Sequence, residues 1–313
     1  ASSGGDEEIS EEKKAAATTD VFAALVSDRI LVKHPGGRYE FIHSKIASYL
    51  GARALEQKGS EEAAEVALDP AWQDALSFAA AIMDLMPAVQ RRMETTPDLL
   101  YSTLFGLVRW LPDAPAEATW RGELFRRLGA ALMAPQQYPA VRERAMASLI
   151  AAREPNVLFV FRQALQSPNP EIQRLGCIGM GALGSEDAIP DLEKMIHDAN
   201  RPVQLAAALS LGAIGTDKAI EVMIHGLFQG ASELQRAIAE ALAAIPGEGH
   251  NTLREAIVAD EIEIRRAAVY GLTRVSRPWA LTTLYRTMFE DEQWYVRSAA
   301  ETAFLLAQSP DRE

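Results

Sequence analysis

A helical pattern that returns six times in the second half of the chain constrains the fold more than any other feature. Each copy starts with an apolar residue, and successive starts are 31, 31, 31, 30 and 32 residues apart: Val141, Ile172, Val203, Leu234, Ile264 and Val296. A fixed period of this size leaves room for two helices per copy and is typical of a helical solenoid. We therefore predict an all-α fold, with a right-handed superhelix of helix pairs over residues 138–313.

Further positions repeat with the same period. The fourth residue after each start is mostly small, which lets neighbouring helices approach closely: Ala145, Gly176, Ala207, Ile238, Ala268 and Ala300. The eighth is large and apolar: Leu149, Met180, Leu211, Leu242, Leu272 and Phe304. We expect both columns in the core. Second helices are expected to begin near Ala188, Ala219, His250 and Ala280, after glycine C-caps at Gly184 and Gly215.

Composition and charge restrict the class of partner. The chain has 313 residues, a net charge of -12 and a pI of about 5.0. This acidity argues against a nucleic-acid surface, because affinity for phosphates depends on clustered Lys and Arg. The one cysteine, Cys177, is expected in the core and fits a reducing compartment. No apolar run approaches the ~20 residues that span a bilayer. We expect a cytoplasmic protein that binds neither nucleic acid nor membrane.

Three segments precede the array. Residues 1–19 are small and charged, and we predict a disordered acidic linker; the chain lacks an initiator Met, which fits a fragment of a longer protein. For residues 20–58 the pattern predicts a helix, a hairpin and a second helix, which is the ending of a winged-helix unit. A tight turn is expected at Pro35-Gly36-Gly37. Residues 59–137, with helices expected at 72–86 and 98–110, are predicted to be divergent helical pairs that cap the array.

The segment after the hairpin carries a family resemblance. The run GRYEFIHSKIASYLGARAL at 37–55, followed by LDPAW at 68–72, resembles the end of the winged-helix domain in NACHT-type STAND signalling NTPases. The matching residues are Phe41, His43, Tyr49, Leu50, Gly51, Ala52 and Arg53, whereas Ala47 and Ser48 replace the Gln-Glu often found there. The resemblance implies that His43 contacts the β-phosphate of bound ADP in an intact parent that uses ADP or ATP. The array itself resembles HEAT-like repeats of the phycobilin-lyase subtype.

Motifs for chemistry are missing from the sequence. It contains no G-x-x-x-x-G-K-[ST] loop to hold a nucleoside triphosphate, and no H-E-x-x-H. One cysteine cannot build a thiolate zinc site. We therefore expect no enzymatic activity, metal or cofactor in this chain by itself. For His43, the structural alternative is a strand-end histidine hydrogen-bonded into a small core.

The second helices are predicted to line the concave, ligand-binding side of the solenoid. Their alignment places one outward column at Gln163, Lys194, His225 and Arg286, with Glu193 and Tyr285 in the column beside it. Trp294, in the last copy, is expected to be uncovered. Mixed charge with an aromatic residue favours a protein or peptide ligand over a polyanion. The alternative for each residue is an ordinary solvated surface.

Three functional hypotheses follow. The leading one is a sensor or partner-binding arm of a NACHT/STAND-type signalling NTPase. In it, ligand capture on the solenoid biases packing against an upstream nucleotide-binding domain. The second is a free-standing scaffold or adaptor. The third, suggested by the repeat subtype, is a phycobilin lyase-like protein that handles a chromophore.

Overall fold

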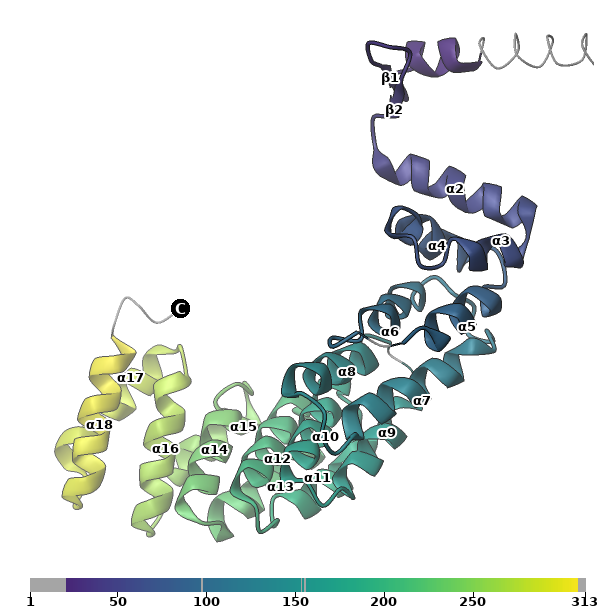
Figure 1. Ribbon diagram of the computed structural model, residues 1–313. Helices are drawn as coiled ribbons and strands as arrows, with labels where there is room; N and C mark the ends of the chain where they lie inside the picture. The colour runs from purple at the N-terminus through teal and green to yellow at the C-terminus, as the bar shows by residue number, and fades with distance from the viewer. Residues whose placement is uncertain (1–20, 97, 153, 155, 309–313) are drawn as a thin grey trace, which may run out of the picture. The chain divides into compact units, whose positions relative to one another are not determined.

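The computed structural model describes residues 21–308 apart from 97, 153 and 155 (Figure 1). The linker predicted at residues 1–19 lies outside the described residues. The chain divides into two compact units, Ala1–Leu124 and Phe125–Glu313. The functional domain boundaries expected at residues 58 and 137 stay predictions.

The first unit begins with the predicted order of helix, hairpin and helix. Residues 21–27 are helical, and the strands β1 (Leu31–Lys33) and β2 (Tyr39–Phe41) pair antiparallel. In this register Leu31 pairs with Phe41 and Lys33 with Tyr39. The turn between the strands places Gly36 at a φ of 81° and Gly37 at 75°, values that glycine adopts without a steric penalty.

The rest of this unit consists of short helices. These are α2 (Ser44–Lys58), α3 (Ser60–Glu65), the 3-10 turn η1 (Pro70–Trp72), α4 (Gln73–Ala79), α5 (Met86–Glu94), α6 (Ser102–Leu107), the 3-10 turn η2 (Val108–Trp110) and α7 (Trp120–Met133), which crosses into the second unit. Predicting one helix over 72–86 was wrong. The chain turns after Ala79, and the Asp84 carboxylate accepts a hydrogen bond from the Met86 amide where α5 begins. The helix expected from residue 98 begins only at 102, because Tyr101 adopts a left-handed φ of 55°.

The second unit is the predicted array of helix pairs. Its first helices are α8 (Pro139–Ala152), α10 (Pro170–Leu183), α12 (Arg201–Ile214), α14 (Ser232–Leu242), α16 (Ile262–Arg274) and α18 (Trp294–Ala307). Its second helices are α9 (Val157–Leu165), α11 (Ile189–Met195, after the 3-10 turn η3, Glu186–Ala188), α13 (Asp217–Gln229), α15 (Glu248–Ala256) and α17 (Pro278–Glu290). Successive first helices pack on one another, and from α10 onward each also packs on the second helix before it.

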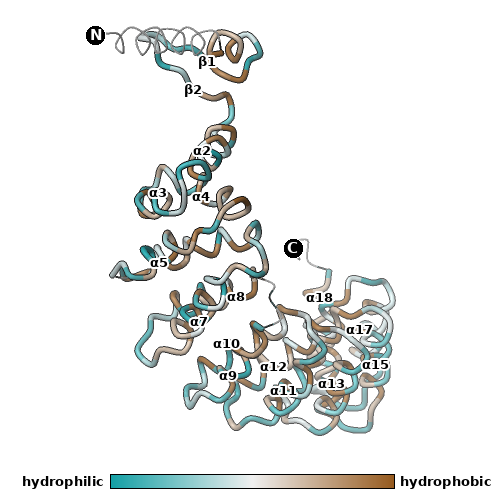
Figure 2. Tube along the Cα trace, turned by 90° about the vertical axis from the view of Figure 1, so that its right-hand side faces the viewer, coloured by the Kyte–Doolittle hydropathy of each residue, from teal (hydrophilic) through white to brown (hydrophobic). Residues whose placement is uncertain are grey.

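The predicted columns form the core of the array. All six starting residues and all six residues four positions later are buried. The eighth-position column is buried from Leu149 to Leu272, whereas Phe304 in α18 is partly exposed. Figure 2 shows the result along the chain, with hydrophobic residues recurring inside the helices and hydrophilic ones at the turns. The all-α HEAT-like solenoid predicted from the repeat is confirmed.

Glycine C-caps and asparagine N-caps mark the ends of α10 and α12. Gly184 and Gly215 take left-handed C-cap conformations, with φ of 66° and 64°, as the sequence predicts. At the start of α10, the Asn169 side chain accepts a hydrogen bond from the Glu171 amide. Asn200 occupies the same position before α12, but its Oδ1 is buried without a hydrogen-bond partner among the described residues.

In several copies, the side chain of the residue after the start donates to carbonyl oxygens of the preceding turn. In α8, the Arg142 guanidinium donates to the carbonyl oxygens of Ala134 and Pro135 at 2.7 and 3.0 Å. Arg265 in α16 likewise donates to two turn carbonyls and also forms an ion pair with Asp291, with side chains only 13% and 7% exposed. These contacts satisfy backbone oxygens that the second helices leave without partners.

Candidate partner-binding groove

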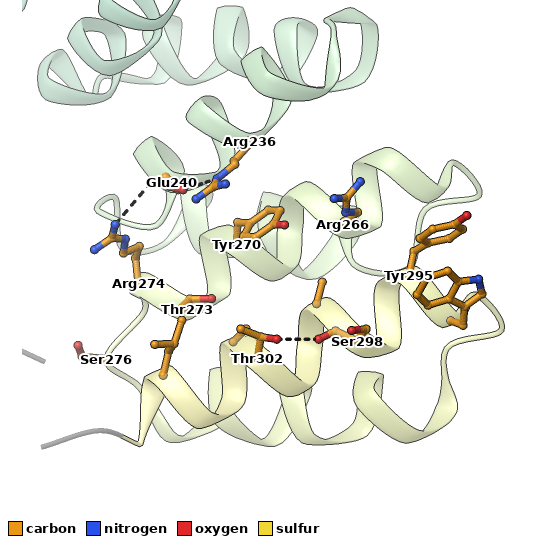
Figure 3. Close-up of a pocket in the computed structure, with 14 residues that line it drawn as sticks. Arg236, Glu240, Arg266, Tyr270, Thr273, Arg274, Ser276, Tyr295, Ser298 and Thr302 are labelled. Carbon is orange, nitrogen blue, oxygen red and sulfur yellow. Dashed lines mark hydrogen bonds and ion pairs between the residues drawn. The ribbon is translucent and has the colours of Figure 1, made fainter. Parts of the chain in front are cut away.

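A groove on the first-helix side of the array brings together residues of three successive first helices. It encloses about 870 Å³ and crosses α14, α16 and α18 (Figure 3). We call it the first-helix groove. The lining residues that matter for chemistry are Arg236, Glu240, Arg266, Tyr270, Trp294 and Tyr295.

The repeat explains why these residues face outward together. Arg236, Arg266 and Ser298 each lie two residues after a buried start, and Glu240, Tyr270 and Thr302 each lie six residues after it. These positions flank the buried fourth-position column on one helical face, because residues four apart are neighbours on a helix. Since α14, α16 and α18 pack side by side, equivalent positions become adjacent in space.

Electrostatic contacts order one end of the groove. The Arg236 Nε donates to the Glu240 carboxylate at 2.9 Å, and the Arg236 guanidinium carbon lies 4.1 Å from the centre of the Tyr270 ring. Arg274 approaches Glu240 at 3.8 Å. Arg266 lies 3.5 Å from Glu263 on its own helix. The lining therefore contains three guanidinium groups against the single carboxylate of Glu240.

The other end of the groove is aromatic. The rings of Trp294 and Tyr295 stack with centroids 3.9 Å apart, and the two residues are 59% and 52% exposed. Two adjacent exposed aromatic residues at a hollow provide apolar area with little loss of side-chain entropy on binding. Arginine and aromatic side chains are the types enriched at the energetic centres of protein interfaces.

The predicted partner-binding column on the second helices does not line the first-helix groove. Gln163, Glu193, Lys194, His225, Tyr285 and Arg286 are all exposed, as expected of an outward column. Arg286 forms an ion pair with Glu290 at 3.0 Å and lines a smaller hollow of about 430 Å³. Tyr285 packs against the rings of Phe289 and Phe304. Of the predicted partner-binding residues, Trp294 is the one that lines the first-helix groove.

Sequence reasoning missed the basic half of this groove. Arg236, Arg266 and Tyr270 were available as a signal, because they repeat at fixed distances from the buried starts. The prediction aligned only the second helices, on the expectation that those helices line the concave side. The larger hollow instead lies on the side of the first helices.

His43 is exposed and lies immediately before α2, without a hydrogen bond from its side chain to that helix. The structural alternative, a histidine bonded into a small core, is therefore wrong. The nucleotide contact implied by the family resemblance stays a prediction.

Other chemistry is limited in the described residues. They contain no group of three or more His, Cys, Asp or Glu arranged to hold a metal ion. Cys177 is buried as predicted, and burial raises the pKa of its thiol to about 12, so it carries almost no thiolate at neutral pH. No helix in the described part of the chain has the length and apolar character needed to cross a membrane.

The repeats define the class of protein, an α-solenoid. Residues 127–203 and 158–243 match HEAT repeats, so this part of the chain is an array of HEAT repeats. The match does not include residues 37–55. Among curated proteins, none matches the chain.

Several solved structures are similar to the chain. One is the complex of CpcE and CpcF of phycocyanin lyase from Nostoc sp. PCC7120, at 18% identity over 72% of this chain and 90% of that one, with a TM-score of 0.38. Human deoxyhypusine hydroxylase is 19% identical over 82% of this chain and 98% of that one, with a TM-score of 0.31. An engineered protein is 19% identical over 65% and 96%, also with a TM-score of 0.31.

Proposed function

We propose that this chain is a non-catalytic, partner-binding arm that holds a protein or peptide ligand in the first-helix groove. The observation that carries the proposal is the groove itself: three successive first helices place arginine and aromatic side chains around one hollow. HEAT repeats offer such extended surfaces because each copy adds equivalent positions beside the last. This is the function of a scaffold.

We further propose that the arm belongs to a NACHT/STAND-type signalling NTPase in the cytoplasm, whose nucleotide-dependent switch lies outside this chain. Support comes from the resemblance at 37–55 and from the exposure of its matching residues His43, Tyr49 and Leu50. Exposed residues are available to a neighbouring domain. A ligand on the solenoid would shift the switch through a difference in its affinity for the two states.

Partner binding is tested by photo-crosslinking in the intact protein. A benzoylphenylalanine in place of Tyr270 should cross-link one partner reproducibly. Arg236→Glu should reduce the yield at least about tenfold, because it reverses a charge in the groove. The matched control is Arg286→Glu with Lys194→Glu on the second helices, which should leave the yield unchanged. Loss of cross-linking in the control but not in Arg236→Glu would assign binding to the second-helix column instead.

Coupling to a switch needs a separate test. In the longer parent protein, ADP release should change rate when the cross-linked partner is added, and His43→Ala should speed release without the partner. The 313-residue chain alone should show no ADP binding by calorimetry. A partner that binds without altering nucleotide release would identify a free-standing adaptor.

A further inference from the structure

We propose that the first-helix groove selects an acidic peptide in an extended conformation, with the pattern acidic-x-x-acidic-x-x-aromatic. The proposal rests on the partner-binding function given above and adds the chemistry of the ligand. It follows from the charge, the spacing and the order of the side chains that line the groove.

The charge of the groove opposes that of the whole chain. A protein of net charge -12 places three arginines and one glutamate around this hollow. Glu240 lies between Arg236 and Arg274, so its carboxylate holds both guanidinium groups in place without neutralising both. An acidic ligand supplies the missing negative charge. A guanidinium can bind a carboxylate through two parallel N–H donors.

Two of the guanidinium groups are available to a ligand. Arg266 makes only a 3.5 Å ion pair with an exposed glutamate one turn away, a kind of contact that contributes little to stability. Arg236 uses Nε for Glu240 and stacks on Tyr270, which fixes the side chain while it stays half exposed. Both groups can therefore donate hydrogen bonds to a ligand carboxylate at small cost.

The spacing of the helices sets the spacing of the ligand residues. Arg236 and Arg266 occupy equivalent positions on α14 and α16, which pack side by side. Packed helices lie roughly 8–10 Å apart, and an extended chain advances about 3.3 Å per residue. Carboxylates that reach both arginines are therefore about three residues apart. On the next helix, α18, the equivalent position is Ser298, and the stacked rings of Trp294 and Tyr295 lie about one turn before it. In Figure 3, Arg266 lies between Tyr270 and Tyr295.

A peptide fits these features better than a nucleic acid does. A phosphate backbone would place negative charge beside Glu240 and against the acidic surface of the chain as a whole. A peptide can instead present isolated carboxylates with uncharged residues between them. Its last residue can also carry an apolar side chain that contacts Trp294 and Tyr295.

The test measures binding of labelled probes to the full chain by fluorescence anisotropy. The first probe is a glycine-rich peptide with two glutamates three residues apart and a tryptophan three residues further on. Replacing both glutamates by glutamine should weaken binding at least about tenfold, and moving them to adjacent positions should weaken it several-fold. A fifteen-residue oligothymidylate is the polyanion probe. Equal binding of the glutamine peptide, or tighter binding of the oligothymidylate, would overturn the proposal.

Variants of the chain show where the peptide probe binds. Arg266→Gln should weaken binding of the acidic peptide by about tenfold, and Trp294→Ala with Tyr295→Ala should weaken it similarly. Arg286→Gln, which removes an exposed ion pair on the other side of the array, is the matched control and should have no effect. Melting temperatures show whether each variant folds. If the acidic probes fail while cross-linking from position 270 still requires Arg236, the groove binds a partner of different chemistry. If both fail, the proposed function fails too.

Discussion

The starting residues of the array and several apolar residues of the hairpin and α2 differ in their burial. In the array, every starting residue is buried, because the period places equivalent helices side by side. In the first unit, the hairpin and α2 leave Val32, Tyr39, Ile42, Tyr49 and Leu50 between 40% and 51% exposed. At these starting positions the neighbouring copies of the repeat cover each residue, whereas an irregular segment depends on contacts specific to it.

The largest expected difference in stability between the units concerns two arginines that are mostly shielded from solvent. Arg265 in the array faces the buried carboxylate of Asp291. Whereas Arg265 is partly buried, Arg92 in the first unit is fully buried; it donates to the Ala67 carbonyl and lies over Trp110. Burial lowers the pKa of Arg92, whereas the hydrogen bond to Asp291 raises that of Arg265. The two guanidinium groups therefore stabilise the fold by different means.

Arg265→Met should lower the free energy of unfolding by roughly 3–5 kcal/mol, because it leaves a buried charge without its partner. Arg92→Met should stay within about 1 kcal/mol of wild type, since losing one hydrogen bond is offset by removing a desolvated charge. Urea denaturation followed by circular dichroism measures both. Equal losses of stability in the two variants would mean that the Asp291 carboxylate does not make Arg265 more important for folding than Arg92.

The next test compares apolar truncations. Leu211→Ala in the buried column of α12 should cost about 2–5 kcal/mol, the range for a buried leucine whose cavity does not collapse. Val32→Ala in the hairpin, where the residue is 42% exposed, should cost well under about 1 kcal/mol. The same denaturation measurement applies. A large loss for Val32→Ala would indicate that the hairpin is covered in solution, for instance by a second molecule.

The array was largely predictable from sequence, and the reasons are physical. Val141 to Val296 recur because each copy repeats the same packing problem, so the period identifies both the fold and the buried columns. The break after Ala79 and the left-handed Tyr101 were missed, because they depend on local turn contacts that have no repeat to reveal them. Of the groove, only the exposed Trp294 was predicted. Trp294 was expected to be exposed, but the role of Arg236 beside Tyr270 depends on which side of the array is hollow.

A third test compares two equivalent caps inside the array. Asn169 accepts a hydrogen bond from Glu171, whereas the Oδ1 of Asn200 is buried without a partner in the described chain. Asn169→Ala should therefore cost about 1 kcal/mol, and Asn200→Ala should be neutral or slightly stabilising. Midpoints of urea denaturation compare the two directly. Equal costs would show that the cap at Asn200 forms in solution and that the two copies are equivalent.

The smallest expected effect on stability concerns the carboxylate of Asp98 in the first unit, because its contribution depends on pH. The Asp98 carboxylate accepts hydrogen bonds from the amides of Ser102 and Leu100 at the start of α6. The Ser102 amide is the main reason that the pKa of Asp98 lies below its ordinary value. A lowered pKa means that the folded state favours the ionised form. The stabilisation is therefore present above the pKa of the unfolded chain and is lost as pH falls through the lower, folded pKa.

Asp98→Asn should thus be less stable than wild type at pH 7, and the difference should shrink as the pH is lowered below about 4. Asn169 is the matched cap in the array. Its side chain does not ionise, so the difference between Asn169→Ala and wild type should not change over the same range. Urea denaturation at several pH values measures both differences. If the gap for Asp98→Asn stays constant on acidification, the carboxylate is not bonded to the amides, and α6 begins without a charged cap.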